Sequence, residues 1–123
     1  MISYHPAPEL KAKLQNIVQI LEMQHVDTGR LATFRSTGSA SRAIARCYAL
    51  SKIWQQTLNT RAHYIIEVVS EKFDKLSEDD KEKVLIHELL HIPKTFGGGF
   101  RQHDYVCSRN VEILHRKLKR QIY

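Results

Sequence analysis

The sequence predicts an α+β fold in which a small sheet packs against an N-terminal, a central and a C-terminal helix. Apolar residues recur every three or four positions over residues 8–24 and from Val106 onward, as in helices with one buried face. Residues 63–69 are rich in β-branched and aromatic side chains, which is typical of a strand. With 123 residues, 42% of them hydrophobic, the chain is the size of one domain, so we expect a single domain over residues 1–123.

The first elements follow from turn and helix signals. Pro8 suits the first position of a helix, and the apolar periodicity continues to Gln24. Asp27, Thr28 and Gly29 indicate a turn, after which alternating apolar and basic residues predict a short strand over residues 30–35. Small polar residues over 36–42 then predict a loop.

The middle of the chain is predicted to add two strands and a short helix. Residues 43–50 fit both the helical and the strand period, and we interpret them as a strand. Ser51 can cap a helix that ends near Asn59, in which Trp54 is expected to anchor the core. The strand over residues 63–69 either runs beside a cleft and offers its edge to an extended substrate or lies inside the sheet.

The central helix carries the motif that points to chemistry. Ser77 and the acidic residues after it form a helix cap, and Pro93 ends the helix. Within it stands His-Glu-x-x-His, in which His87 and His91 lie on one face with Cβ atoms about 6 Å apart. Both rings can therefore bind one zinc ion, and the Glu88 carboxylate can act as general base on a zinc-activated water.

A catalytic zinc ion usually takes three protein ligands, so a third is needed. We favour His103, because the flexible connector with Gly97, Gly98 and Gly99 lets the chain double back. Glu112, Asp104 and His115 remain alternatives, of which Asp104 better suits the orientation of an imidazole. Tyr105, Arg101 and His115 are candidate donors to the tetrahedral intermediate.

These motifs resemble the small zincin-type metallopeptidases of archaea and phages and, more distantly, the SprT-like proteases. The matching residues are His87-Glu88-Leu89-Leu90-His91-Ile92-Pro93, Gly97-Gly98-Gly99-Phe100 and His103, with weaker likeness at Arg35-Ser36-Thr37-Gly38-Ser39 and Lys52-Ile53-Trp54-Gln55. The resemblance implies a compact zincin-like domain, with the active-site helix packed beneath a small twisted sheet. It also implies His103 as the third ligand.

Our functional hypothesis is a zinc-dependent metallopeptidase that hydrolyses peptide bonds of peptide or protein substrates. The alternatives are a basic, metal-stabilised module that binds nucleic acid or protein, and an SprT-like protease acting on DNA-associated proteins. Nucleic acid would bind the basic face of the C-terminal helix, although such a run of charge is more often simply solvated. The residues of this face are Arg109, Arg116, Lys117, Lys119 and Arg120.

Composition gives expectations about location. No apolar run approaches the ~20 residues that cross a bilayer, and the N-terminus lacks a basic start followed by an apolar stretch. Cys47 and Cys107 form no C-x-x-C pair, so we expect reduced thiols. The net charge of +6 suits acidic partners. We therefore expect a cytoplasmic protein without a membrane partner.

Overall fold

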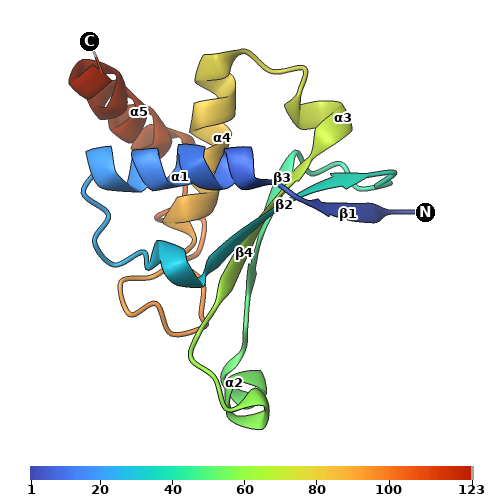
Figure 1. Cartoon of the computed structure of the whole chain (residues 1–123). Coiled ribbons are helices and arrows are strands. Elements are labelled where there is room, and N and C mark those ends of the chain that lie inside the picture. The colour runs from blue at the N-terminus through green and yellow to red at the C-terminus, as the bar shows by residue number, and fades with distance from the viewer. Residues whose placement is uncertain (123) are drawn as a thin grey trace.

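A computed structural model describes the backbone of residues 1–122 and the side chains of residues 1–120. Tyr123, the last residue of the predicted domain, lies outside the described residues. The described chain forms a four-stranded mixed sheet and five α-helices, so the predicted α+β class is confirmed (Figure 1). The elements are β1 (Ser3–Pro6), α1 (Pro8–Ile20), the 3₁₀ turn η1 (Thr28–Arg30), β2 (Leu31–Thr37), β3 (Ala45–Ala49), α2 (Lys52–Leu58), β4 (Tyr64–Val69), α3 (Ser70–Phe73), α4 (Glu78–Leu90) and α5 (Ser108–Ile122).

The strand order of the sheet is β1-β2-β4-β3. β2 and β4 are parallel, whereas β1 pairs with β2 and β3 pairs with β4 in antiparallel fashion. The strand predicted over residues 63–69 is therefore interior, and the alternative that it offers a free edge is wrong. The strand predicted over residues 43–50 is confirmed as β3, and it forms an outer edge of the sheet beside α4.

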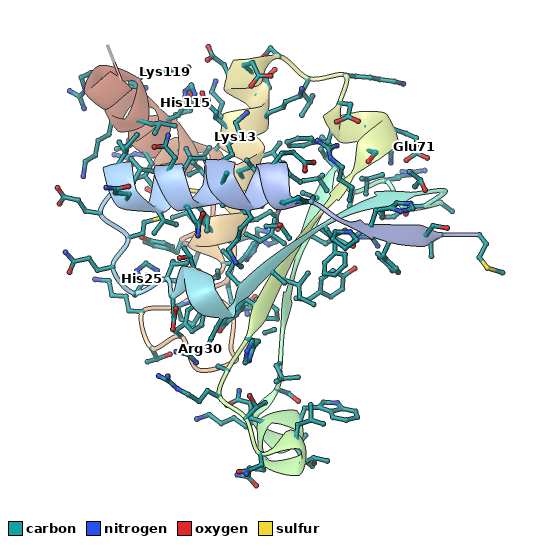
Figure 2. All side chains as sticks on the ribbon, in the orientation of Figure 1. Lys13, His25, Arg30, Glu71, His115 and Lys119 are labelled. Atoms are coloured by element: carbon teal, nitrogen blue, oxygen red, sulfur yellow. The ribbon has the colours of Figure 1, made fainter. Side chains whose placement is uncertain are left out.

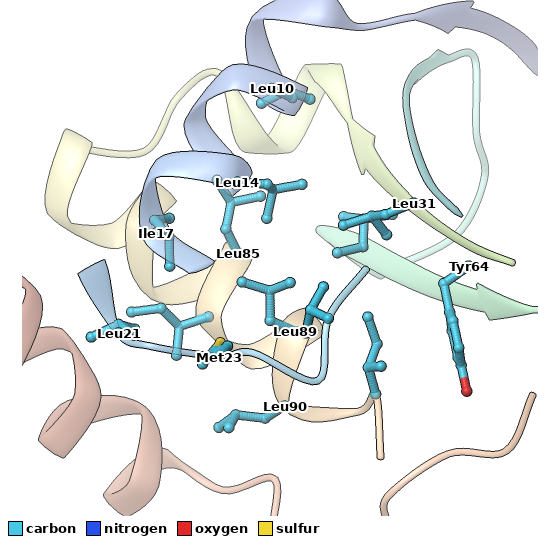
Figure 3. Packing of buried hydrophobic residues seen from close by; sticks show 14 of the residues in the cluster. Leu10, Leu14, Ile17, Leu21, Met23, Leu31, Tyr64, Leu85, Leu89 and Leu90 are labelled. Carbon is cyan, nitrogen blue, oxygen red and sulfur yellow. The ribbon is translucent and has the colours of Figure 1, made fainter. Parts of the chain in front are cut away.

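The core lies between the sheet and the helices α1 and α4. Alternation along β4 points Tyr64, Ile66 and Val68 to one face, where all three are fully buried. They share one hydrophobic cluster with Leu14 of α1 and Leu85 of α4 (Figure 3). α4 is therefore held against the sheet by a continuous apolar face.

The end of α1 differs from the prediction, whereas the start of α4 agrees with it. α1 ends at Ile20 rather than at Gln24, and Glu22 takes a positive φ of 55° that no α-helix continues. α4 starts as predicted, because the Ser77 hydroxyl accepts a hydrogen bond from the Asp80 N–H at 3.1 Å. None of the described helices is long and apolar enough to cross a membrane.

The prediction that Trp54 anchors the core is wrong. Its side chain is 56% exposed, and Ile53 and Leu58 on the same helix are also exposed. α2 projects beyond the end of the sheet, away from α1 and α4, so its apolar side chains have no layer to pack against (Figure 1). Neither β1 nor α3 was predicted, because both are four-residue elements with too few positions to show a period.

Candidate metal centre

The first two candidate ligands lie at the C-terminal end of α4. His87 occupies the last turn, and His91 is the capping residue just after the helix, not inside it as predicted. His91 nevertheless keeps a helical backbone, with φ of −68° and ψ of −19°. The two rings therefore stay on one face, with centroids 5.2 Å apart.

His103 joins them from the loop between α4 and α5. Its ring centroid lies 5.9 Å from that of His87 and 5.1 Å from that of His91. One ring nitrogen of each histidine lies within 4.8 Å of the other two. Three converging imidazoles suit a divalent metal ion, because imidazole nitrogen is a favoured ligand of zinc and related metals.

The loop is brought back by contacts around Gly98. Gly98 has a φ of +106°, and a Cβ there would lie 2.6 Å from the Leu50 carbonyl oxygen, so this position requires glycine. The Tyr64 hydroxyl accepts a hydrogen bond from the Gly98 N–H and donates one to the Gly99 carbonyl, at 3.0 and 2.7 Å. The side-chain amide of Gln55 donates to the Gly97 carbonyl at 3.0 Å. The connector expected to be flexible is thus hydrogen-bonded to α2 and β4.

Arg101 orients the second histidine through its backbone. The Arg101 N–H donates to the His91 carbonyl at 2.8 Å, and His91 Nδ1 lies 2.9 Å from the Arg101 carbonyl oxygen. A proton on Nδ1 donates to that carbonyl and leaves Nε2 with a lone pair for a metal. Asp104, expected to orient an imidazole, instead accepts a hydrogen bond from the Tyr105 N–H at 2.8 Å.

Glu88 is a buried carboxyl group beside this cluster. Its side chain is on α4, the residue is only 7% exposed, and burial raises its pKa to about 7. Burial also lowers the pKa of His87, assisted by the nearby His91 and His103. Burial therefore favours the neutral form of His87, which is the form that binds metals, and brings Glu88 into the range useful for proton transfer at neutral pH.

Two cavities meet at His87 and Glu88 and form a groove along the edge strand β3. The first, of about 460 Å³, is bounded by Ile44, Val84 and Val111 and by charged side chains. The second, of about 440 Å³, also contains His91 and His103 and extends past Cys47, Tyr48 and Phe100. We call these the α5-side cavity and the loop-side cavity. The three histidines and Glu88 therefore border a space open to a ligand.

The alternative ligands take other partners. Glu112 lines the α5-side cavity but pairs with Lys83, Oε1 to Nζ, at 3.0 Å. The ring of His115 is buried, and its Nε2 lies 3.1 Å from Glu82 Oε1. Of the three expected donors, Arg101 lines the loop-side cavity, and its guanidinium carbon lies 3.3 Å from the Tyr105 ring centroid.

A second group of metal-ligand residues, which sequence reasoning missed, joins α4 to α5. Asp79, Glu82 and His115 each offer a donor atom within 4.8 Å of the others. The ammonium group of Lys119 lies 2.9 Å from Asp79 Oδ1 and 3.0 Å from Glu82 Oε1. Figure 2 labels His115 and Lys119 on α5. We call the first group the histidine cluster and this one the lysine-filled cluster. No pattern in the sequence indicates the second, because His115 lies 33 positions after Glu82 in the chain.

Comparison with known proteins gives one match. A family described as "Putative phage metallopeptidase" matches residues 2–121, nearly the whole chain. Neither the curated proteins nor the solved structures give a match.

Proposed function

Because the chain belongs to this phage metallopeptidase family, we propose that it is a zinc-dependent peptidase with Glu88 as general base. His87, His91 and His103 are the proposed zinc ligands. The observation that carries the proposal is the convergence of three imidazoles beside a buried carboxyl group in an open groove. A zincin-like arrangement within a single domain over residues 1–123 is part of the same proposal.

Glu88 and Arg101 have separate proposed roles at this site. When bound, the metal ion supplies Lewis acidity that activates water and polarises the substrate carbonyl. Glu88 takes a proton from the attacking water and passes it to the leaving amine, a role suited to a carboxyl group whose pKa lies near neutrality. The Arg101 carbonyl keeps the His91 ring in the tautomer and orientation that a ligand needs.

The substrate is proposed to lie along β3. This strand pairs with β4 on one side only, and its residues Ala45, Cys47 and Tyr48 line the groove. An extended peptide can pair with a free strand edge through its backbone, which gives affinity without a requirement for particular side chains. The strand edge that pairs with substrate is thus proposed to belong to β3 and not to residues 63–69, which form the interior strand β4.

Zinc-loaded protein and a mixture of short peptides test the proposal. We expect cleavage that a chelator abolishes, and we expect Glu88→Gln to keep zinc but to lose about 10²- to 10⁴-fold in turnover. Glu22→Gln, a change at an exposed carboxylate after α1, is the matched control and should behave as wild type. Undiminished turnover by Glu88→Gln contradicts the assignment of the base. Zinc binding without cleavage of any peptide favours the metal-stabilised binding module.

The alternative of a protease that acts on DNA-associated proteins depends on the basic residues of α5. Arg109, Arg116 and Arg120 are exposed there, whereas Lys119 is paired with Asp79 and Glu82. Single-stranded and duplex DNA added to the peptidase assay test this version. Stimulation that disappears at high salt supports it, because contacts with phosphates depend strongly on ionic strength.

A further inference from the structure

The α5-side cavity has an unusual balance of charge. Lys83 and Glu112 neutralise each other across it, and Glu88 is the proposed base. Arg42 remains, and among the described residues no carboxylate forms an ion pair with it. The cavity next to the proposed zinc site therefore contains an exposed guanidinium that no ion pair of the described residues engages.

The strand side of the groove contributes no compensating acid. Between Asp27 and Glu67 the chain contains six basic residues and no Asp or Glu. Three of these, Arg30, Arg35 and Arg46, pair with carboxylates from other segments. Of the six basic residues, Arg42 lines the groove and forms no ion pair with a described carboxylate.

The backbone around Arg42 is held in place. The Ser41 carbonyl accepts a hydrogen bond from Lys72, and the Ala43 N–H donates to the Ser41 hydroxyl at 3.1 Å. Two residues after Arg42, the Ile44 carbonyl accepts from the Val69 N–H at 2.8 Å. Arg42 thus extends from an anchored backbone, so this segment loses little further entropy when the guanidinium binds a ligand.

The walls of the cavity strengthen such an interaction. Ile44, Val84 and Val111 line it with apolar surface, and Val111 is almost fully buried. Arg42 itself is exposed, so water partly screens its charge, and the apolar wall on one side of it reduces that screening. A guanidinium can also hold both oxygens of a carboxylate at once.

We propose that Arg42 makes the α5-side cavity a specificity subsite for a carboxylate of the substrate, close to the scissile bond. The inference rests on the proposed peptidase function and adds its substrate class. The carboxylate can come from an Asp or Glu side chain or from the C-terminus of the peptide. In the second case the enzyme removes residues from the ends of peptides.

The test starts with a peptide mixture in which every sequence is supplied both as free acid and as C-terminal amide. Mass spectrometry of the products from zinc-loaded protein locates the cleavage sites. Matched peptides with Glu, Gln or Lys at the preferred position, and the acid and amide forms, are then each given to wild type, Arg42→Gln and Arg61→Gln. The kcat/KM values of the three proteins are compared. Arg61 is an exposed arginine between α2 and β4 that does not line either cavity, so it is the control.

We expect wild type to prefer the carboxylate-bearing peptide by about 10-fold or more in kcat/KM, as for a charge-assisted hydrogen bond. Arg42→Gln should abolish the preference, whereas the control Arg61→Gln should retain it. A preference for Glu assigns the side-chain source, and a preference for the free acid over the amide assigns the C-terminus.

Two results overturn the subsite: a wild type that cleaves peptides with no carboxylate preference, and an Arg42→Gln protein that keeps the preference. If no peptide is cleaved, the peptidase proposal fails separately, and fluorescence anisotropy still tests the subsite. Labelled Glu and Gln peptides, each as free acid and as amide, are titrated into zinc-loaded Glu88→Gln with and without Arg42→Gln. Equal binding of all these peptides to both proteins overturns it.

Discussion

The two clusters of metal-ligand residues lie at opposite ends of α4 and differ in what fills them. In the histidine cluster three imidazoles converge on the groove. In the lysine-filled cluster the Lys119 ammonium already contacts both carboxylates, and His115 Nε2 lies 3.1 Å from Glu82 Oε1 and 3.9 Å from Asp79 Oδ1. In both clusters the donor atoms lie within 4.8 Å of one another, so proximity alone does not make a metal site.

The charges explain the difference. Lys119 lowers the pKa of Asp79, and the two carboxylates raise the pKa of Lys119, so each group stabilises the charged form of its partner. Around His87, burial favours the neutral form. A metal ion would have to displace the Lys119 ammonium from the lysine-filled cluster, whereas the histidine cluster holds no such cation among its three members. We infer that the lysine-filled cluster joins α4 to α5 and that the histidine cluster binds the metal.

The largest expected effect is the stabilisation by metal. Zinc in excess of its dissociation constant by about 1,000-fold should stabilise the wild type by about 4 kcal/mol, because it binds the folded state. His103→Ala should lose most of this gain. Thermal unfolding with and without zinc measures it, and His115→Ala, although less stable overall, should keep the zinc-dependent shift. Loss of that shift in His115→Ala would reverse the assignment of the two clusters.

The affinity for zinc gives the next largest contrast. His91→Ala should weaken zinc binding by at least about 100-fold, since even groups that only orient a ligand contribute 10- to 100-fold. His115→Ala should change it by less than about 2-fold. Competition with a fluorescent zinc chelator measures both. Similar weakening in the two variants would contradict the comparison.

Parts of the site that depend on side-chain type could be anticipated from the sequence. Ser77 caps the start of α4, Pro93 lies just beyond its capping residue His91, and the His-Glu-x-x-His spacing places His87 and His91 on one face. His103 was expected to return through the glycine-rich connector, and its ring does lie beside the other two. Their role as ligands stays a prediction.

Features set by tertiary pairing could not be anticipated. The Arg101 carbonyl that contacts His91 belongs to the backbone, which is the same at every position, so no residue pattern marks it. Whether β4 is an edge depends on β3 pairing beside it, and an apolar run suits both cases. Trp54 is exposed because α2 lies beyond the layers that form the core, which its local sequence does not encode.

A smaller effect is expected from Glu82, a member of the lysine-filled cluster. Its Oε1 lies 3.1 Å from His115 Nε2 and 3.0 Å from Lys119 Nζ, and its side chain is only 12% exposed. Glu82→Gln should therefore destabilise the metal-free protein by about 1–2 kcal/mol. Urea unfolding measures this, with Glu22→Gln as control. A change in zinc affinity instead of stability would show that the lysine-filled cluster also contributes to zinc binding.

The smallest effect is expected from Asp79, which pairs with Lys119 but is 61% exposed. Its pKa is lowered, chiefly by the hydrogen bond from Lys119, so the folded state favours the ionised form. Its contribution to stability is present above the unfolded pKa of about 4 and is lost as the pH falls through the lower folded value. Asp79→Asn should therefore be slightly less stable than metal-free wild type at pH 7, and the gap should narrow as the pH falls below the unfolded pKa of about 4. Urea unfolding over a descending pH series measures it, and a gap that does not narrow would mean that Asp79 acts through packing rather than through its charge.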